Sequence, residues 1–205
     1  MARERDEGKR LAILAAAKRL FAKTGFDATS VADLSREVAL PVGTLYTYFE
    51  NKDAIVQTLV AEGWASFFET LSSAVTGPGS PEERLSLIVY RFLPELFSDL
   101  DLISIILARA DKDDELEDKL ERLGALVSSL MAELADSRGL SFDFPPKRAM
   151  AAIGVYLLGS LDTLRVSRSA GIDLGAEDLI DFIRLSVQSS FGVELKYPSS
   201  PSKTD

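Results

Sequence analysis

The chain has 205 residues, of which 46% are hydrophobic and 27% charged, the composition of a globular protein that can bury a substantial core. Its net charge is −9, and it contains neither cysteine nor histidine. Disulfides, thiolate chemistry and the commonest general base are therefore excluded, so an enzyme is disfavoured and no metal site or cofactor is expected.

Apolar residues recur at helical spacing along nearly the whole chain, and no alternating run of strand length interrupts them. The first helix is predicted over residues 7–24, with Gly25 placed as a left-handed C-terminal cap. Ser30 followed by Asp33 is typical of a capping box, which predicts that a second helix begins there.

The stretch LPVGTLYTYFENKD, residues 40–53, contains a short third helix that runs to Phe49. Pro41 is tolerated in its first turn, because the missing N–H would have no helical partner there. Asn51 is placed to cap a fourth helix that begins near Lys52.

Longer helices are predicted over residues 52–75, 81–98, 101–111, 114–137, 146–169 and 176–192. A kink is expected before Pro94. The leucines of residues 116–134 predict a buried core helix, since their heptad repeat is short for a zipper. The Pro/Ser-rich tail, residues 194–205, is predicted to be disordered.

The predicted fold is all-α, with about nine helices in two domains. Residues 1–52 form a three-helix unit with the shape of a helix-turn-helix, and residues 53–193 form a larger helical bundle. Two short helices joined by a tight turn, the second about eight residues long, are typical of this motif, whose second helix enters the major groove of DNA.

The third helix has two predicted faces. Leu45 and Phe49, four residues apart, anchor it to the other helices. The opposite face presents Val42, Gly43, Tyr46 and Thr47. A glycine leaves room for close approach to a base edge, and hydroxyls can bind bases or phosphates. These hydroxyls belong to Thr44, Tyr46, Thr47 and Tyr48; half-buried packing of the two tyrosines is the alternative.

Charge along the chain favours the same interpretation. Residues 1–52 contain nine basic and seven acidic residues, so their charge is +2, whereas the remainder contains 14 basic and 25 acidic residues, so its charge is −11. Only the first part is suited to a polyanion. A lysine at the start of a helix is unfavourable by about 0.3–1 kcal/mol, because its charge opposes the helix dipole. A phosphate bound near Lys52 would explain this position, and a surface lysine without a role is the alternative.

The run ILAAAKRLFAKTGFDATSVADLSREVALPVGTLYTYFENKDAIVQTL, residues 13–59, resembles the DNA-binding domain of the tetracycline-repressor (TetR) family, above all in VGTLYTYFENKDAI. The resemblance covers about the first quarter of the chain. It implies groove or base contacts from Val42, Gly43 and Tyr46. It implies phosphate contacts from Thr29 or Ser30, Thr47, Tyr48 and Lys52.

Two departures from the family pattern affect the expected contacts. Many relatives have serine in place of Pro41, so a hydroxyl contact is missing here. Many also have histidine or a basic residue in place of Thr47 or Tyr48, which lowers the expected number of phosphate charges. The operator sequence is therefore not transferable from the family.

The resemblance also implies a homodimer through residues 146–169 and 176–192. The first segment has small residues that permit close helix approach, and the second has an apolar stripe at Leu179, Ile183, Val187 and Phe191. Internal packing of these faces is the alternative.

A ligand pocket within the middle helices is the third implication of the resemblance. The candidate ligand-binding residues are aromatic, with one arginine: Trp64, Phe67, Phe68, Tyr90, Phe97, Tyr156 and Arg109. Further polar candidates are Arg91, Asp162 and Arg165. Pockets for small molecules are mostly apolar with a few polar groups, although ordinary core packing is the alternative for each aromatic residue.

The leading hypothesis is a cytoplasmic, homodimeric repressor that releases a palindromic operator when a small apolar or amphipathic molecule binds the bundle. Helix 52–75 would act as the lever between two states. Two other hypotheses are an enzyme that uses a buried Asp162 and a helical adaptor that binds a protein through residues 116–134. We expect no signal peptide and no membrane span, because the apolar run 149–161 is short and Gly-rich.

Overall fold

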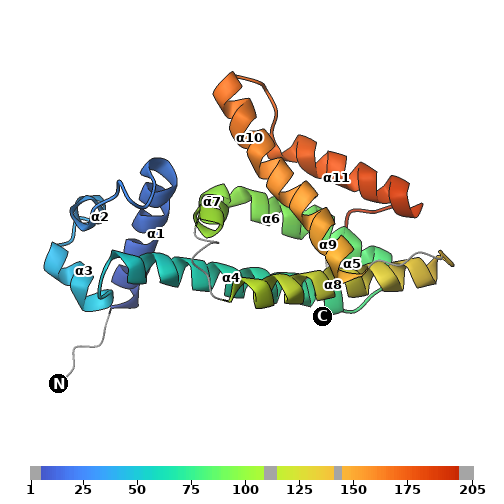
Figure 1. The fold of residues 1–205 in the computed structure, drawn as a ribbon, viewed down its shortest axis with the longest axis horizontal. Coiled ribbons are helices and arrows are strands. Elements are labelled where there is room, and N and C mark those ends of the chain that lie inside the picture. Colours follow the sequence, from blue (N-terminus) through green and yellow to red (C-terminus); the bar gives the residue numbers. More distant parts are fainter. Residues whose placement is uncertain (1–5, 109–114, 141–144, 199–205) are drawn as a thin grey trace, which may run out of the picture. The chain divides into compact units, whose positions relative to one another are not determined.

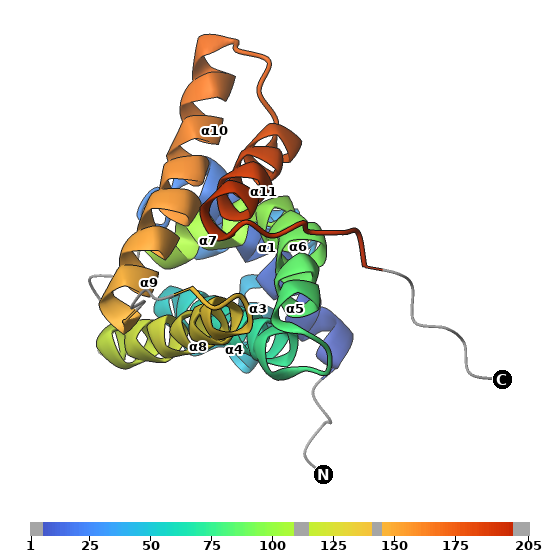
Figure 2. The same ribbon diagram turned by 90° about the vertical axis from the view of Figure 1, so that its right-hand side faces the viewer.

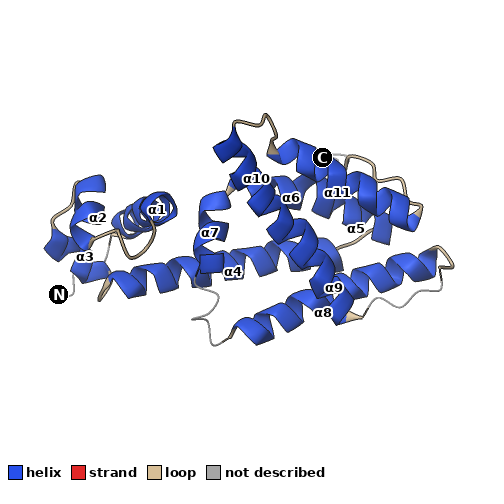
Figure 3. Cartoon of the chain, turned by 45° about the horizontal axis from the view of Figure 1, so that its top comes forward, coloured by secondary structure: helices blue, strands red, loops and turns tan. Residues whose placement is uncertain are grey.

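The computed structural model describes residues 6–108, 115–140 and 145–198, and within these ranges it contains helices and loops but no strand (Figures 1 and 3). The predicted all-α fold is confirmed. The helices are α1 (Glu7–Thr24), α2 (Val31–Glu37), α3 (Val42–Tyr48), α4 (Lys52–Thr76), α5 (Pro81–Leu87), α6 (Leu93–Ser98), α7 (Leu100–Ala108), α8 (Leu116–Ser137), α9 (Pro146–Ile153), α10 (Gly159–Ala170) and α11 (Ala176–Phe191), with π-helical turns at Ile88–Phe92 and Gly154–Leu158.

The chain divides into two compact units. Unit 1 comprises residues 1–66 and 99–113, and unit 2 comprises residues 67–98 and 114–205. The division falls inside α4 rather than at residue 52, and α7 belongs to unit 1 because it packs along α1. Residues 99–113 return to unit 1 through the long-range packing of α7 on α1, and helix periodicity does not reveal such a contact.

Local capping signals determine where the helices of unit 1 begin. The Ser30 N–H donates to the Asp33 carboxylate at 2.8 Å, and the Asp33 N–H donates to the Ser30 hydroxyl oxygen at 3.1 Å. The hydrogen bonds from Ser30 lower the pKa of Asp33. Asn51 accepts a 2.8 Å hydrogen bond from the Ala54 N–H. Both predicted caps are confirmed.

Two predicted details differ in the structure. Gly25 does end α1 with a positive φ of 84°, but its ψ of 157° is extended rather than left-handed helical. Pro41 lies before α3 as its N-cap, with ψ at 143°, and is not in the first turn. Proline therefore leads the chain into α3 in an extended conformation.

The core of unit 1 joins α1, α2, α3, the start of α4 and α7 (Figure 1). Leu34 of α2 is completely buried, and Leu45 of α3 is 1% exposed. The buried residues of this cluster are Ile13, Leu14, Ala17, Phe21, Leu34, Leu45, Phe49, Ile55, Val56, Leu59 and Ile105. The short helices α2 and α3 are thus held by tertiary packing, which seven-residue helices need in order to be stable.

Unit 2 is built around α8, which lies beside α5 and the start of α9 (Figure 2). Leu123, Leu130 and Leu134 are buried along one side of α8, so the prediction of a core helix is confirmed. A buried charge joins three segments at this point. Arg84 of α5 donates to the Val75 carbonyl at 2.6 Å and pairs with Glu133 of α8.

Two of the predicted helices of the bundle, 81–98 and 146–169, each contain a π-helical turn. One turn, Ile88–Phe92, lies just before Pro94, where a kink was predicted. The other, Gly154–Leu158, separates α9 from α10. An added residue in a helical turn shifts the register of every following side chain, so helical periodicity alone misassigns the faces beyond it.

The described part of the predicted disordered tail packs on unit 2. Val193 and Leu195 are buried, and the Tyr90 hydroxyl donates to the Leu195 carbonyl at 3.1 Å. The Tyr90 and Tyr197 rings lie 5.3 Å apart. Within the tail itself, Leu195 is buried and bonded to Tyr90 and Tyr197 contacts the Tyr90 ring, whereas residues 199–205 lie outside the described ranges.

One helical stretch in the described part of the chain, Pro146–Ala170, is long and apolar enough to cross a membrane by length and composition. A single such stretch is weak evidence for a span, because helices of soluble proteins meet the same criterion. Most of this stretch is exposed in a single chain.

Candidate nucleic-acid interface

Helix α3 is fixed to unit 1 by one buried side. Leu45 is 1% exposed and Phe49 is buried, as predicted for the anchoring residues. The Phe49 N–H donates to the Leu45 carbonyl at 3.0 Å, and the Thr44 N–H donates to the Pro41 carbonyl at 2.8 Å. The other side of α3 is consequently presented outward in a fixed orientation.

That outward side has no charge. Val42 is 38% exposed and Tyr46 is 52% exposed, and Gly43 and Thr47 are also exposed. Neither end of α3 carries an acidic or a basic residue. An exposed face made of a phenol, a hydroxyl and two small apolar positions offers hydrogen bonds and methyl contacts without repelling phosphates, which is suited to reading base edges.

Gly43 has no explanation within the fold. A Cβ atom added to it would meet no atom within 4 Å, and its φ is not positive. Glycine inside a helix lowers stability by roughly 0.5–1 kcal/mol relative to alanine. The packing of the chain itself therefore does not require glycine at this position.

Tyr48 and Thr44 are less accessible than predicted. Tyr48 is half-buried and packs against the core of unit 1, and Thr44 is also half-buried. The Thr47 hydroxyl is exposed but donates to the Thr44 carbonyl at 2.6 Å. Of the two tyrosine rings, only that of Tyr46 stands clear of the core.

Three predicted phosphate-binding groups have partners inside unit 1. Thr29 is 2% exposed, and its hydroxyl donates to the Gly25 carbonyl at 2.8 Å. The Ser30 hydroxyl belongs to the capping box of α2. The Lys52 ammonium donates to the Phe26 and Thr29 carbonyls. The sequence pattern did not single out Phe26, because its partner is distant along the chain.

The predicted ligand-binding aromatic residues are only partly brought together. Phe67 makes edge contacts with Phe68 and Phe92, at centroid distances of 5.8 and 5.2 Å. The guanidinium of Arg122 lies 4.8 Å from the centre of the Phe68 ring. These four residues form one cluster inside unit 2.

The other candidates lie elsewhere. Tyr90 contacts the C-terminal segment, and Tyr156 faces Phe182 of α11 at 6.5 Å. Phe97 is buried in α6, and Trp64 belongs to unit 1. Arg109 lies outside the described residues.

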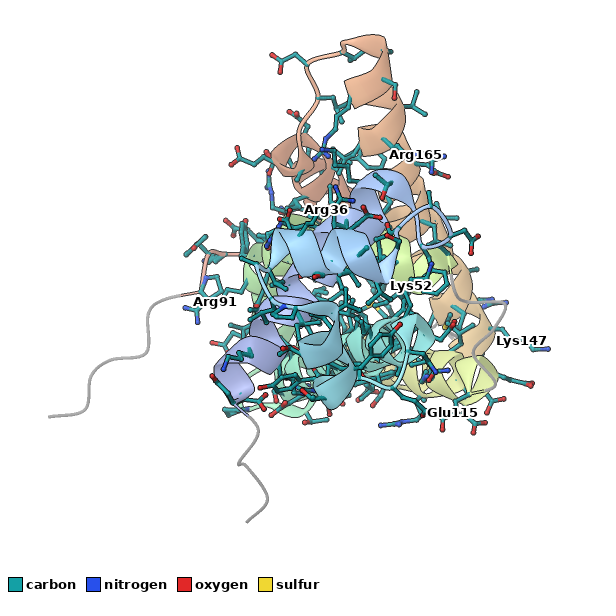
Figure 4. The ribbon with its side chains drawn as sticks, turned by 90° about the vertical axis from the view of Figure 1, so that its left-hand side faces the viewer. Arg36, Lys52, Arg91, Glu115, Lys147 and Arg165 are labelled. Carbon is teal, nitrogen blue, oxygen red and sulfur yellow. The ribbon has the colours of Figure 1, made fainter. Side chains whose placement is uncertain are left out.

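The polar candidates of the bundle are exposed rather than buried. Arg165 and Asp162 form an ion pair at 3.8 Å with both side chains more than three-quarters exposed, and Arg91 is exposed as well (Figure 4). An exposed carboxylate lacks the environment that a catalytic acid requires, which removes the basis of the enzyme hypothesis at Asp162. Among the described residues of unit 2, Arg84 is a buried charge, and sequence periodicity did not single it out.

Comparison with known proteins is consistent with this geometry. Residues 13–59 match the family described as "Bacterial regulatory proteins, tetR family". The chain is 27% identical over 94 residues to the fatty acid metabolism regulator protein of Bacillus subtilis (strain 168), covering 46% of this chain and 48% of that protein. It is 28% identical over 86 residues to the regulator HbdR of Aromatoleum sp. (strain CIB), covering 42% and 38%. The matched segment thus spans half or less of the length of these curated relatives.

Solved structures share the fold over most of the chain. A putative fatty acid metabolism regulator of Clostridium perfringens superposes with a TM-score of 0.69 at 19% identity, covering 90% of this chain and all of that one. FadR from Bacillus subtilis, solved in complex with stearoyl-CoA, superposes with a TM-score of 0.64 at 18% identity, with the same coverage. The N-terminal segment, residues 13–59, thus belongs to the TetR family of bacterial regulatory proteins, and the rest of the chain shares the fold of these solved regulators.

Proposed function

We propose that the chain is a homodimeric transcriptional repressor of the cytoplasm that binds a palindromic operator through α3 and releases it when an amphipathic molecule binds unit 2. The observation that carries the DNA-binding part is the uncharged, exposed face of α3 around Gly43. The proposed base or groove contacts are Val42, Gly43 and Tyr46. Thr47 shares their exposed face, whereas Thr44 and Tyr48 are half-buried.

Gly43→Ala is expected to weaken operator binding by roughly 10- to 100-fold, the cost of one misplaced base contact. The free energy of unfolding should stay the same or rise by up to about 1 kcal/mol, because alanine is the better helix former and the added Cβ has open space. Fluorescence anisotropy with a duplex from the DNA upstream of the coding region measures the affinity, and urea unfolding measures the stability.

Gly8→Ala is the matched control, since it adds the same methyl group to α1 of the same unit. Its Cβ would meet only the Asp6 carboxylate, at 3.1 Å. The control should bind the duplex like the wild type. Equal affinities of Gly43→Ala and wild type would contradict the assignment of α3 as the reading helix.

A helical adaptor that binds a partner protein through residues 116–134 is the alternative. The burial of Leu123, Leu130 and Leu134 argues against it, because these apolar side chains of α8 are not available on the surface. An adaptor would give no sequence-specific binding of the upstream duplex in excess competitor DNA.

For the effector we propose a molecule with a long acyl chain. The proposal is supported by two relatives named as fatty acid metabolism regulators and by FadR from Bacillus subtilis, which was solved in complex with stearoyl-CoA. The cluster of Phe67, Phe68 and Phe92 in unit 2 supports it as well. Stearoyl-CoA at 100 times its dissociation constant should stabilise the chain by about 2.7 kcal/mol and release the labelled duplex. Free coenzyme A, which lacks the acyl chain, should do neither; release by both compounds would refute an acyl-chain effector.

The proposed dimer interface uses the exposed apolar side chains of α10, α11 and the π-helical turn between α9 and α10. These are Val155, Leu158, Val166, Phe182 and Leu185. The predicted stripe of α11 is not this face, since Ile183 is buried and Leu179, Val187 and Phe191 are half-buried within unit 2. An exposed apolar patch of this kind marks an interaction surface, and a second copy would cover it symmetrically.

A further inference from the structure

Lys52 is the first residue of α4, and its ammonium group is engaged with the loop between α1 and α2. The Nζ atom donates to the Phe26 carbonyl at 2.7 Å and to the Thr29 carbonyl at 2.8 Å. It also lies 4.1 Å from the centre of the Phe26 ring. An ammonium carries three N–H donors, so two are used by carbonyls while the charge faces an aromatic ring.

The loop that Lys52 holds is itself tightly organised. The Phe26 ring packs on Phe21 of α1 at 5.3 Å. Thr29 is buried, and its hydroxyl is bonded to the Gly25 carbonyl and shares a 2.8 Å hydrogen bond with the Thr24 hydroxyl. The residue after Thr29 is Ser30, the cap of α2, so the position of this loop determines where α2 begins.

Helix α2 in turn packs against α3. Lys52 is therefore connected to α3 by three successive contacts, all within unit 1. Lys52 contacts the loop, the loop leads into α2, and α2 packs against α3. The unfavourable position of a lysine in the first turn of a helix is offset by these two charge-assisted hydrogen bonds, and no phosphate is needed to account for it.

We infer that Lys52 is a positioning residue for DNA binding, which sets the orientation of α2 and α3 by holding the Phe26 and Thr29 carbonyls and does not contact phosphate. The inference rests on the proposed function of α3. It replaces the phosphate contact that the sequence pattern predicts for this lysine. By contrast, the side chain of Arg36, on α2 of the same unit, pairs with Asp33 but is 77% exposed (Figure 4).

The two roles differ in how affinity depends on salt. A lysine that neutralises one phosphate contributes about 0.9 to the slope of log affinity against log salt concentration. A lysine that holds a loop contributes nothing to that slope. Lys52→Met should therefore lower the affinity for the upstream duplex about tenfold at every salt concentration and leave the slope unchanged.

Phe26→Leu provides a second test that leaves the charge of the protein intact. It removes the ring under the ammonium but keeps the carbonyl acceptors, so a loss of about threefold in affinity is expected, again with an unchanged slope. A phosphate contact by Lys52 predicts wild-type affinity for this variant. Both variants are compared with the wild type at a temperature where near-UV circular dichroism shows all three fully folded.

Amide hydrogen exchange distinguishes positioning from a general loss of stability. In Lys52→Met the amides of Ser30, Val31 and Asp33 should exchange faster, while those of Ile13 and Leu14 in α1 should not. Binding of the duplex by the wild type tests the proposed function, whereas the comparison of slopes tests this inference alone. A slope lowered by about 0.9 in Lys52→Met, with wild-type affinity in Phe26→Leu, would overturn it.

Discussion

Phe182→Glu is expected to convert the dimer into a monomer and to reduce operator affinity at least about 100-fold, because two reading heads on one particle gain that much from avidity. Phe182 is 61% exposed on α11 and lies against Tyr156, next to the exposed Leu185. Burying a carboxylate at the centre of an apolar interface, without a partner, costs several kcal/mol. The monomer itself should remain folded, since the residue is on its surface.

Analytical ultracentrifugation at about 10 μM, a concentration at which micromolar or tighter dimers persist, measures the association, and anisotropy measures the binding of DNA. Leu11→Glu is the control, because it places the same charge on an exposed apolar residue of α1, outside the proposed interface. That variant should sediment as a dimer. If Phe182→Glu sediments as a dimer, the interface lies elsewhere. If that dimeric variant also binds lipid vesicles, a membrane rather than a second copy would contact the exposed side of Pro146–Ala170.

Leu45→Ala is expected to destabilise unit 1 by about 2–5 kcal/mol, the usual cost of a cavity at a fully buried leucine. Leu45 is 1% exposed and supplies the buried side chain of α3. The operator complex should be lost together with stability, because a loosened α3 no longer presents its outer face in one orientation. Urea unfolding followed by circular dichroism measures the stability.

Val42→Ala on the same helix gives the matched comparison, since its side chain is 38% exposed. It should change the free energy of unfolding by no more than about 0.5 kcal/mol and alter the preference among operator sequences. The two variants therefore distinguish the role of the buried face of α3 in stability from the role of its exposed face in DNA recognition. Equal destabilisation by both would mean that α3 is not seated as described.

The parts of the fold that depend on neighbouring residues were predictable from the sequence. The capping box of Ser30 and Asp33 and the cap at Asn51 act over three residues, so their residue types alone indicate where α2 and α4 begin. The buried pair Leu45 and Phe49 follows from helical periodicity in the same way. The match of residues 13–59 to the TetR family was likewise predictable from these residues.

Features that depend on distant residues were not predictable. The partners of Lys52 lie 26 and 23 residues earlier in the chain, so its residue type suggested a phosphate where the fold supplies carbonyls. Helix α11 has apolar residues on two sides, and only the structure distinguishes the inward Ile183 from the outward Phe182. The buried Leu195 accepts a hydrogen bond from Tyr90, 105 residues away.

Thr47 illustrates how one internal hydrogen bond narrows what a residue can recognise. Its hydroxyl has a single hydrogen, which it gives to the Thr44 carbonyl. While that bond lasts, the oxygen can only accept. Phosphate oxygens also only accept, so they are unsuited to it, whereas the exocyclic amino groups of adenine and cytosine project donors into the major groove. Thr47 would then bias the operator toward adenine or cytosine at the base it meets instead of adding to sequence-independent affinity.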